Sequence, residues 1–272
     1  MKLPVHHKKT TNSVFLDGAI TQIRVIKALI LREILTRFGD RKLGYIWVMV
    51  EPLIQVAIFV GLRTLLGLEN VRDMHVVPFL ITGIVPFYYF RHVTGKVMRA
   101  IHANRGLLVF AQIRFSDLFY ARFLLETATY ITIFILAILV ADAYIVDIQI
   151  NNISASILSF LMLGYCGFAL GVLSAAIIPV FDAFQSYVNI ALRILYFISG
   201  ILFAMTSIPQ EYHALLAWNP IVHGIELFRY NFLEGFHPID TFMNGTYVVT
   251  LSTIIMLLGF ILVRRMKKWI MR

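Results

Sequence analysis

The chain has 272 residues, of which 59% are hydrophobic and 14% are charged, and its formal net charge is +9. Soluble globular proteins average about 45–50% apolar and about 25% charged residues, so this composition excludes an ordinary soluble domain and indicates a polytopic membrane protein. The cations cluster at particular points of the chain, so we do not expect nucleic acid as a partner. The one cysteine, Cys166, excludes an intrachain disulfide and a cysteine-based metal site.

Residues 1–43 are expected to form a cytoplasmic N-terminus that includes an interfacial helix. They begin with the polar, basic stretch MKLPVHHKKTTNSVFLDG, which has no apolar core of signal-peptide type. An imperfect apolar stripe follows within residues 17–40, made of Ile20, Ile23, Ile30, Ile34 and Phe38, with Lys27 inside it. Such a helix would lie at the membrane surface, either as an anchor or as a docking surface for a partner.

Six apolar stretches are each long enough to cross a bilayer as a helix, which takes about 20 residues. We predict spans over residues 44–66, 77–102, 118–141, 153–178, 187–205 and 247–263. They would form one transmembrane domain over residues 44–264, followed by a cytoplasmic tail over residues 265–272. The predicted fold is therefore an all-α polytopic membrane protein with six transmembrane helices.

The charges of the links between these spans predict their orientation. Cations concentrate in residues 1–46, in the link between spans two and three, and in the tail RRMKKWIMR. With six spans, all three segments fall on one side. The opposite links are acidic and hold Glu69, Asp73, Asp142, Asp147, Glu211, Glu234 and Asp240. We therefore expect both termini to be cytoplasmic.

Ionisable side chains inside a bilayer are costly, which makes them candidates for function. Span one contains Glu51, which shares a helix face with Trp47, and Arg63, about 18 Å further along the helix. Arg63 is either a cation that reaches the interface or part of a path for an anionic cargo. Glu126, Arg193 and Asp182 are candidates for pairs that join helices.

Span two carries a basic stripe that covers about a third of a helix circumference. The stripe consists of Tyr88, Arg91, His92, Gly95, Arg99 and His102. It could contact anionic lipid headgroups, belong to a solvated extension of the helix, or bind an anionic substrate. The aromatic residues near it, including Trp47, Tyr89 and Phe90, suit interfacial belts and also the stacking of sugar rings.

Motifs of catalysis are missing from the chain. It has no G-x-x-x-x-G-K-[ST] loop, so it should not hydrolyse ATP by a P-loop, and we expect no catalytic residues. His223 and Glu226 match half of a carboxylate-bridged metal site, and no second half accompanies them. We therefore expect no bound metal.

The stretch WNPIVHGIELFRYNFLEG, residues 218–235, lies between spans five and six. Trp218, Asn219 and Pro220 favour a break in the chain, because proline restricts the residue before it. A short amphipathic helix follows, and two such pieces could form an extracytoplasmic re-entrant hairpin. We interpret His223, Glu226 and Arg229 as structural residues of this hairpin.

The stretch NPIVHGIELFRYNFLEG resembles the loop between spans five and six of ABC-2 type ABC transporter permeases. REILTRFGDRKLGYIWVMVEPLIQ, residues 32–55, resembles the entry into span one of the same family. The resemblance covers nearly the whole chain, and more narrowly the chain looks like the KpsM/BexB group of capsular polysaccharide exporters. It implies the permease subunit of an ATP-driven exporter that moves lipid-linked, acidic capsular polysaccharide across a bacterial inner membrane.

The resemblance also implies partners and roles. It implies a homodimer with a separate P-loop ATPase that holds ATP and magnesium, so this chain itself has no cofactor. A periplasmic co-export protein could join them. A substrate path would include Trp47, Glu51, Arg63, Tyr88, Tyr89, Phe90, Arg91, His92 and Arg99. The ATPase would dock on the interfacial helix and on a short helix over residues 105–117, through Arg32, Arg37, Arg105, Phe110, Gln112, Arg114 and Asp117. The outer hairpin would include Trp218, Asn219, Pro220, Glu226 and Arg229.

The residues of the chain leave two other functions open. The chain is similar to permeases for O-antigen and teichoic acid, and nothing in its residues excludes such a cargo or a drug. A membrane-embedded enzyme or an ion-coupled transporter would need a catalytic cluster or paired intramembrane acids, and the sequence shows neither.

Overall fold

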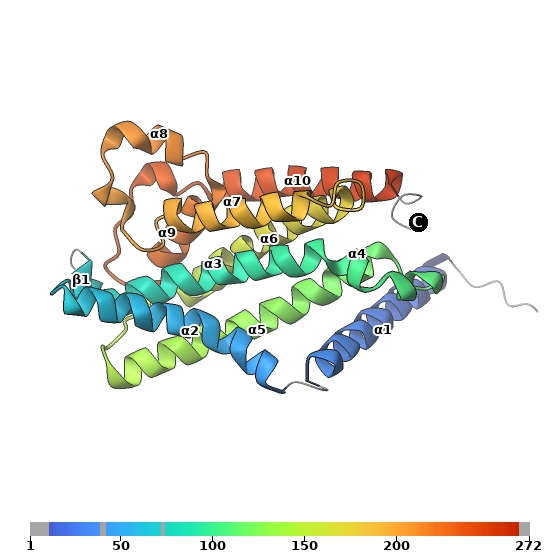
Figure 1. The fold of residues 1–272 in the computed structure, drawn as a ribbon, viewed down its shortest axis with the longest axis horizontal. Coiled ribbons are helices and arrows are strands. Elements are labelled where there is room, and N and C mark those ends of the chain that lie inside the picture. Colours follow the sequence, from blue (N-terminus) through green and yellow to red (C-terminus); the bar gives the residue numbers. More distant parts are fainter. Residues whose placement is uncertain (1–10, 39–41, 72–73, 267–272) are drawn as a thin grey trace, which may run out of the picture.

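The structure is a computed structural model that describes residues 11–38, 42–71 and 74–266. It is a bundle of helices with one pair of two-residue strands, β1 and β2, at one end (Figure 1). Its α-helices and strands are α1 (Thr11–Phe38), α2 (Lys42–Leu65), β1 (Asn70–Val71), β2 (Met74–His75), α3 (Val76–Met98), α4 (Ala100–Ala103), α5 (Phe115–Tyr144), α6 (Ile153–Ile177), α7 (Phe184–Ile198), α8 (His213–Leu216), α9 (Pro220–Phe232) and α10 (Gly245–Arg265). Its 3₁₀ helices are η1 (Arg105–Val109), η2 (Met205–Ser207), η3 (Gln210–Tyr212) and η4 (Asp240–Phe242).

Helix α3 forms the centre of the bundle. Residues 76–90 are buried throughout, and α3 packs against α2, α5, α6, α7 and α9. Small residues of α6 let the two backbones approach closely, because a Cβ atom on Gly167 would lie 2.5 Å from the Phe90 carbonyl oxygen. The stretch of α3 over residues 76–90 is almost wholly apolar around its circumference, which suits such an interior position.

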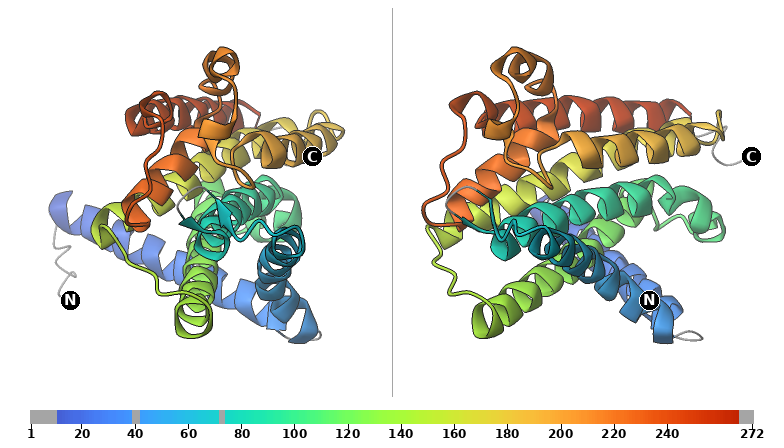
Figure 2. Two further views of the ribbon diagram at one scale, coloured as in Figure 1. Left: turned by 90° about the vertical axis from the view of Figure 1, so that its left-hand side faces the viewer. Right: turned by 60° about the vertical axis from the view of Figure 1, so that its left-hand side comes forward.

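The two ends of the bundle carry different elements (Figures 1 and 2). One end holds α1, α4, η1 and the C-terminal end of α10, and it is rich in arginine. The other end holds the β1–β2 pair, α8 and the start of α9. This separation follows the charge asymmetry of the links.

Within the described residues, five helices are long and apolar enough to cross a membrane. They cover Trp47–Leu65, Val76–Met98, Phe115–Tyr144, Ile153–Ile177 and Asp240–Arg265. These correspond to predicted spans one, two, three, four and six, so the prediction of an all-α membrane protein is confirmed. The predicted fifth span, residues 187–205, overlaps the 15-residue helix α7, which is about 22 Å long. It ends before Gly200, whose φ of +67° turns the chain in a way that favours glycine.

The segment over residues 105–117 is less helical than predicted. It forms the five-residue helix η1 and then extended backbone at Phe110. The predicted helix is interrupted because α5 starts within the same segment. The Asp117 carboxylate accepts the Arg114 backbone N–H at 2.9 Å, and this hydrogen bond caps the N-terminus of α5. Helix α1 covers most of the residues predicted to form the interfacial helix, and it packs against α5.

Candidate functional site

A polar cavity of about 350 Å³ lies between α2, α3 and α7. Its lining consists of Glu51 from α2; Arg91, His92, Gly95, Lys96 and Arg99 from or just after α3; and Asn189, Leu192 and Arg193 from α7. Among the described residues, this lining brings three arginine side chains and one lysine side chain together with one glutamate. A concave site with such an excess of one charge attracts and concentrates anions.

Helical periodicity explains why α3 presents these side chains. Arg91, His92, Gly95 and Arg99 lie on one face, whereas Val93 and Val97 are fully buried on the other. The buried face fits against α6, where a Cβ atom on Gly171 would lie 2.7 Å from Val97 Cβ. Close packing on one side therefore turns the basic stripe toward α2 and α7.

Contacts inside the cavity hold some of its charged groups in place. His92 Nε2 lies 3.8 Å from Glu51 Oε2, and the His92 ring stacks on Tyr88 with centroids 6.1 Å apart. The Arg91 guanidinium lies 5.5 Å from the centre of the same tyrosine ring, within the range of a cation–π contact. Tyr88 thus contacts both the Arg91 and the His92 side chains, and only 5% of its own surface is exposed.

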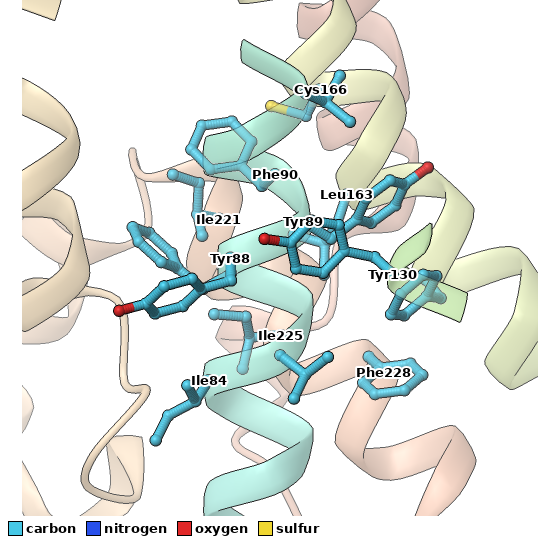
Figure 3. Close-up of a cluster of buried hydrophobic side chains, with 14 of the residues drawn as sticks. Ile84, Tyr88, Tyr89, Phe90, Tyr130, Leu163, Cys166, Ile221, Ile225 and Phe228 are labelled. Atoms are coloured by element: carbon cyan, nitrogen blue, oxygen red, sulfur yellow. The ribbon is translucent and has the colours of Figure 1, made fainter. Parts of the chain in front are cut away.

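Other residues assigned to the substrate path lie outside this cavity. Tyr89 is fully buried, stacks on Phe160 with centroids 4.7 Å apart, and shares a 2.6 Å hydrogen bond with Thr127. Figure 3 shows Tyr88 and Tyr89 leaving α3 on different sides, with Tyr89 near Leu163 and Phe90 in the packed core. Trp47 and Arg63 lie toward opposite ends of α2. The Trp47 side chain is 62% exposed, and the Arg63 guanidinium donates a hydrogen bond to the Leu202 carbonyl oxygen at 2.8 Å.

Sequence reasoning did not assign four of the lining residues, Lys96, Asn189, Leu192 and Arg193, to this site. Lys96 belongs to the same helix face as Arg99, but the predicted stripe did not include it. Asn189 and Arg193 are one helical turn apart on α7, where i and i+4 side chains share a face. That spacing was a usable signal, although Arg193 was predicted as a residue that joins helices.

A groove of about 480 Å³ lies where α1 meets the segment after α4. It is lined by Val25, Ala28, Leu29, Arg32, Leu107, Phe110, Ala111, Gln112 and Ile113. Arg32 also donates to the Asn104 side chain at 2.9 Å. Three residues predicted for ATPase docking, Arg32, Phe110 and Gln112, therefore share one surface.

The other predicted docking residues have different surroundings. Asp117 is fully buried, caps α5 and accepts a hydrogen bond from Gln22 of α1, so it fastens two helices together. Arg105 and Arg114 are exposed at either end of the segment. The side chain of Arg37 lies outside the described part of the structure.

At the opposite end, Asn219 and Pro220 start helix α9. The Asn219 side chain accepts the Ile221 backbone N–H at 3.0 Å and Pro220 occupies the first turn, as helix N-termini favour. Trp218, just before the cap, is 79% exposed.

The Glu226 and Arg229 side chains of α9 are buried inside the protein. Arg229 pairs with Glu226 at 3.2 Å and donates to the carbonyls of Gly200 and Ile201. His223 lies within hydrogen-bonding distance of the Ala217 carbonyl oxygen at 2.8 Å. These contacts give the triad a structural role, and the described residues contain no group of three or more side chains suited to a metal ion.

A family model described as "ABC-2 type transporter" matches residues 24–233. The chain belongs to the ABC-2 type transporter family. The matched segment runs from α1 to the end of α9, so it contains the polar cavity, the groove beside α1 and the buried arginine of α9. The family predicted from the sequence is thereby confirmed.

Curated relatives of this ABC-2 chain include several capsule exporters. It is 33% identical over 238 residues to the polysialic acid transport protein KpsM of Escherichia coli, covering 88% of this chain and 92% of the relative. It is 29% identical over 263 residues to the capsule polysaccharide export inner-membrane protein CtrC of Neisseria meningitidis, covering 96% and 98%. It is 27% identical over 260 residues to the capsule polysaccharide export inner-membrane protein BexB of Haemophilus influenzae, covering 95% and 97%.

Proposed function

We propose that this chain is the permease subunit of an ATP-driven exporter that moves an acidic, lipid-linked capsular polysaccharide across a bacterial inner membrane. The observation that carries the proposal is the cavity in which Arg91, Lys96, Arg99 and Arg193 converge from two helices. Such a concentration of cations inside a helical membrane protein calls for an anionic ligand. The name of the Escherichia coli relative specifies an acidic polymer, which agrees with this charge.

The proposed topology has six spans, with both termini cytoplasmic. In it, α7 and the chain up to Ala204 form the fifth crossing, and α8 and α9 form the re-entrant hairpin on the outer side. The arginine-rich end, with α1, η1 and Arg264 and Arg265 of α10, then faces the cytoplasm. Buried backbone at membrane depth is tolerated where protein supplies its hydrogen bonds, and Arg229 supplies them to residues 200 and 201.

The proposed assembly is a homodimer with a separate P-loop ATPase, and an envelope co-export protein as a further partner. Arg193 is exposed at the cavity, so a second copy of the chain can complete the lining. The ATPase would occupy the groove lined by Arg32, Phe110 and Gln112. ATP and magnesium would remain on that partner.

Transport would then proceed through weak contacts at many points. ATP-driven closure of the partner moves α1 and η1, and this motion shifts the helices around the cavity. The phosphate and the acidic sugars pass along Arg91, Lys96, Arg99 and Arg193, each of which binds reversibly. Tight binding at one point would stall a polymer, whereas a row of exchangeable cations lets it slide.

The test is export by a double variant, Arg91→Gln with Arg99→Gln, in cells that lack their own permease. Loss of two charge-assisted contacts, each worth about 1.5–3 kcal/mol, should lower surface polymer about a hundredfold or more. The matched control, Arg264→Gln with Arg265→Gln, changes two exposed arginines of α10 that lie outside the cavity lining. Normal export by the cavity variant, at a normal amount of protein in the membrane, would refute the proposed role.

Export assays in the same kind of cells distinguish capsular polysaccharide from other cargoes. If the chain restores export of O-antigen or teichoic acid but not of capsule, the permease role stands and the cargo assignment fails. An ion-coupled transporter would instead show uptake or efflux by the purified chain without any ATPase.

A further inference from the structure

Arg122 of α5 connects three helices through its guanidinium group. Its Nη2 lies 3.5 Å from Glu33 Oε2 of α1, and its Nη1 donates to the Lys96 carbonyl oxygen of α3 at 2.7 Å. The Arg122 side chain is 9% exposed and the Glu33 side chain is 22% exposed. Screening by water is therefore weak at this pair, and the planar guanidinium holds both partners in fixed directions.

The carbonyl that Arg122 contacts belongs to a special part of α3. Lys96 lies in the last turn, where carbonyl groups run out of donors from their own helix and where a cation is favoured by the helix dipole. The helix stops at Met98, and Arg99 has φ −93° and ψ 2°, outside the helical pattern. Arg122 therefore stabilises the point at which α3 ends.

That end of α3 is also one wall of the polar cavity. The side chains of Lys96 and Arg99, on either side of the helix terminus, both line it. A displacement or rotation of the last turn of α3 moves these two cations directly. The Arg122 guanidinium thus contacts the turn of α3 that carries two of the cavity's charges.

Among the described residues, other polar contacts between α1 and this end of the bundle involve side chains that do not line the cavity. Arg32 contacts Asn104, and Gln22 contacts Asp117. By contrast, the chain of contacts from Glu33 through Arg122 to Lys96 runs from the groove-bearing helix to the basic side chains. It is a continuous physical connection between a docking surface and a binding cavity.

We infer that Arg122 is a positioning residue that transmits movement of α1 to the basic cavity. The inference rests on the proposed function, because it takes the ATPase to dock beside α1 and the cavity to bind the anionic cargo. In it, Glu33 moves with α1, draws or releases the Arg122 guanidinium, and thereby shifts the last turn of α3. Arg122 touches no cargo itself.

The experiment measures the response of the cavity to ATP in the purified complex of this chain with its ATPase. A reporter cysteine replaces Asn189 in the cavity wall, in a chain whose one native cysteine is removed by Cys166→Ala. The rate of maleimide labelling is measured with and without Mg²⁺-ATP, together with ATP hydrolysis. Arg122→Gln removes both contacts, Glu33→Gln weakens the ion pair alone, and Arg24→Gln is the control on an exposed position of α1.

We expect ATP to change the labelling rate about fivefold or more in the parent and in Arg24→Gln, the size of a moderate coupling energy. Glu33→Gln and Arg122→Gln should hydrolyse ATP with little change in labelling. The double variant should be no worse than Arg122→Gln, because both changes break one connection. If the Arg122→Gln chain does not assemble with the ATPase, the labelling response of Glu33→Gln alone tests the inference.

Several outcomes would overturn the inference. A full ATP response in Glu33→Gln and Arg122→Gln would do so, and so would an equal loss in Arg24→Gln. A double variant with additive losses would show two independent routes. A parent chain that recruits no ATPase, or whose cavity ignores ATP, would refute the proposed function itself and the inference with it.

Discussion

The guanidinium carbon of Arg229 lies 3.8 Å from the centre of the Phe79 ring. Arg229 is fully buried, and its nitrogens also reach the carbonyls of Gly200 at 2.6 Å, Ile201 at 2.8 Å and Phe79 at 3.2 Å. Gly83 leaves the necessary space, since a Cβ atom there would lie 2.4 Å from Arg229 Nη2. One side chain therefore ties α9, α3 and the turn after α7 together.

Arg229→Met should destabilise the protein severely. The change keeps most of the side-chain volume but leaves Glu226 without its cation and removes the donors to three buried carbonyls. Removing one partner of a buried ion pair costs about 3–5 kcal/mol, so we expect a clear drop in the thermal unfolding midpoint and in yield. Glu234→Gln, at an exposed position after α9, is the control. An unchanged midpoint in Arg229→Met would contradict this account.

Helical periodicity made part of the site predictable. A 100° step per residue places Arg91, His92, Gly95 and Arg99 on one face of α3, and this depends on the helix alone. The same step turns Tyr89 away from Tyr88, and the packing against α6 buries Tyr89 and Phe90. Proximity in sequence to a functional stripe is therefore a poor guide to which aromatic rings share it.

Other features depend on contacts between distant parts of the chain. The i, i+4 spacing of Asn189 and Arg193 places them on one face of α7, but they become cavity residues only because that helix packs beside α3, which no local pattern encodes. The helix expected over residues 105–117 is shortened because Asp117 starts α5 and holds Gln22 at the same time. The family resemblance predicted an all-α membrane domain of the ABC-2 type, whereas these long-range contacts required the structure.

Gly167→Ala should push α3 and α6 apart. The added methyl group would lie 2.5 Å from the Phe90 carbonyl oxygen, and a backbone atom cannot rotate away. Overpacking of this kind costs about 1–3 kcal/mol, so the unfolding midpoint should fall. Gly61→Ala is a matched control on α2 with nothing within 4 Å of the new atom. There the loss of backbone freedom in the unfolded chain should leave stability equal or raise it by about 0.5–1 kcal/mol. Equal midpoints for the two variants would argue against close packing of α3 on α6.

Phe110→Ala should weaken the docking of the ATPase. Phe110 lines the groove beside α1 and is 62% exposed, so a partner could bury its ring. Loss of a buried aromatic ring removes about 2 kcal/mol of binding free energy, which corresponds to about a 30-fold weaker complex. Val109→Ala alters the neighbouring residue, which is 79% exposed but does not line the groove. Titration of the purified ATPase against both variants measures the difference, and equal affinities would move the docking site elsewhere.

Arg193→Gln should reduce export although the residue lies on the shortest of the helices around the cavity. Among the described residues, it contributes one of the four cations that converge at the cavity. Its side chain is exposed, where a second copy of the chain would complete the lining. Replacing a charge-assisted contact with a neutral one costs about 1.5 kcal/mol, so surface polymer should fall about tenfold. Arg265→Gln removes the same charge from an exposed position near the end of α10, outside the cavity, and should export normally. If the two variants export equally at equal protein levels, Arg193 serves packing between helices and the anion path must rely on α3 alone.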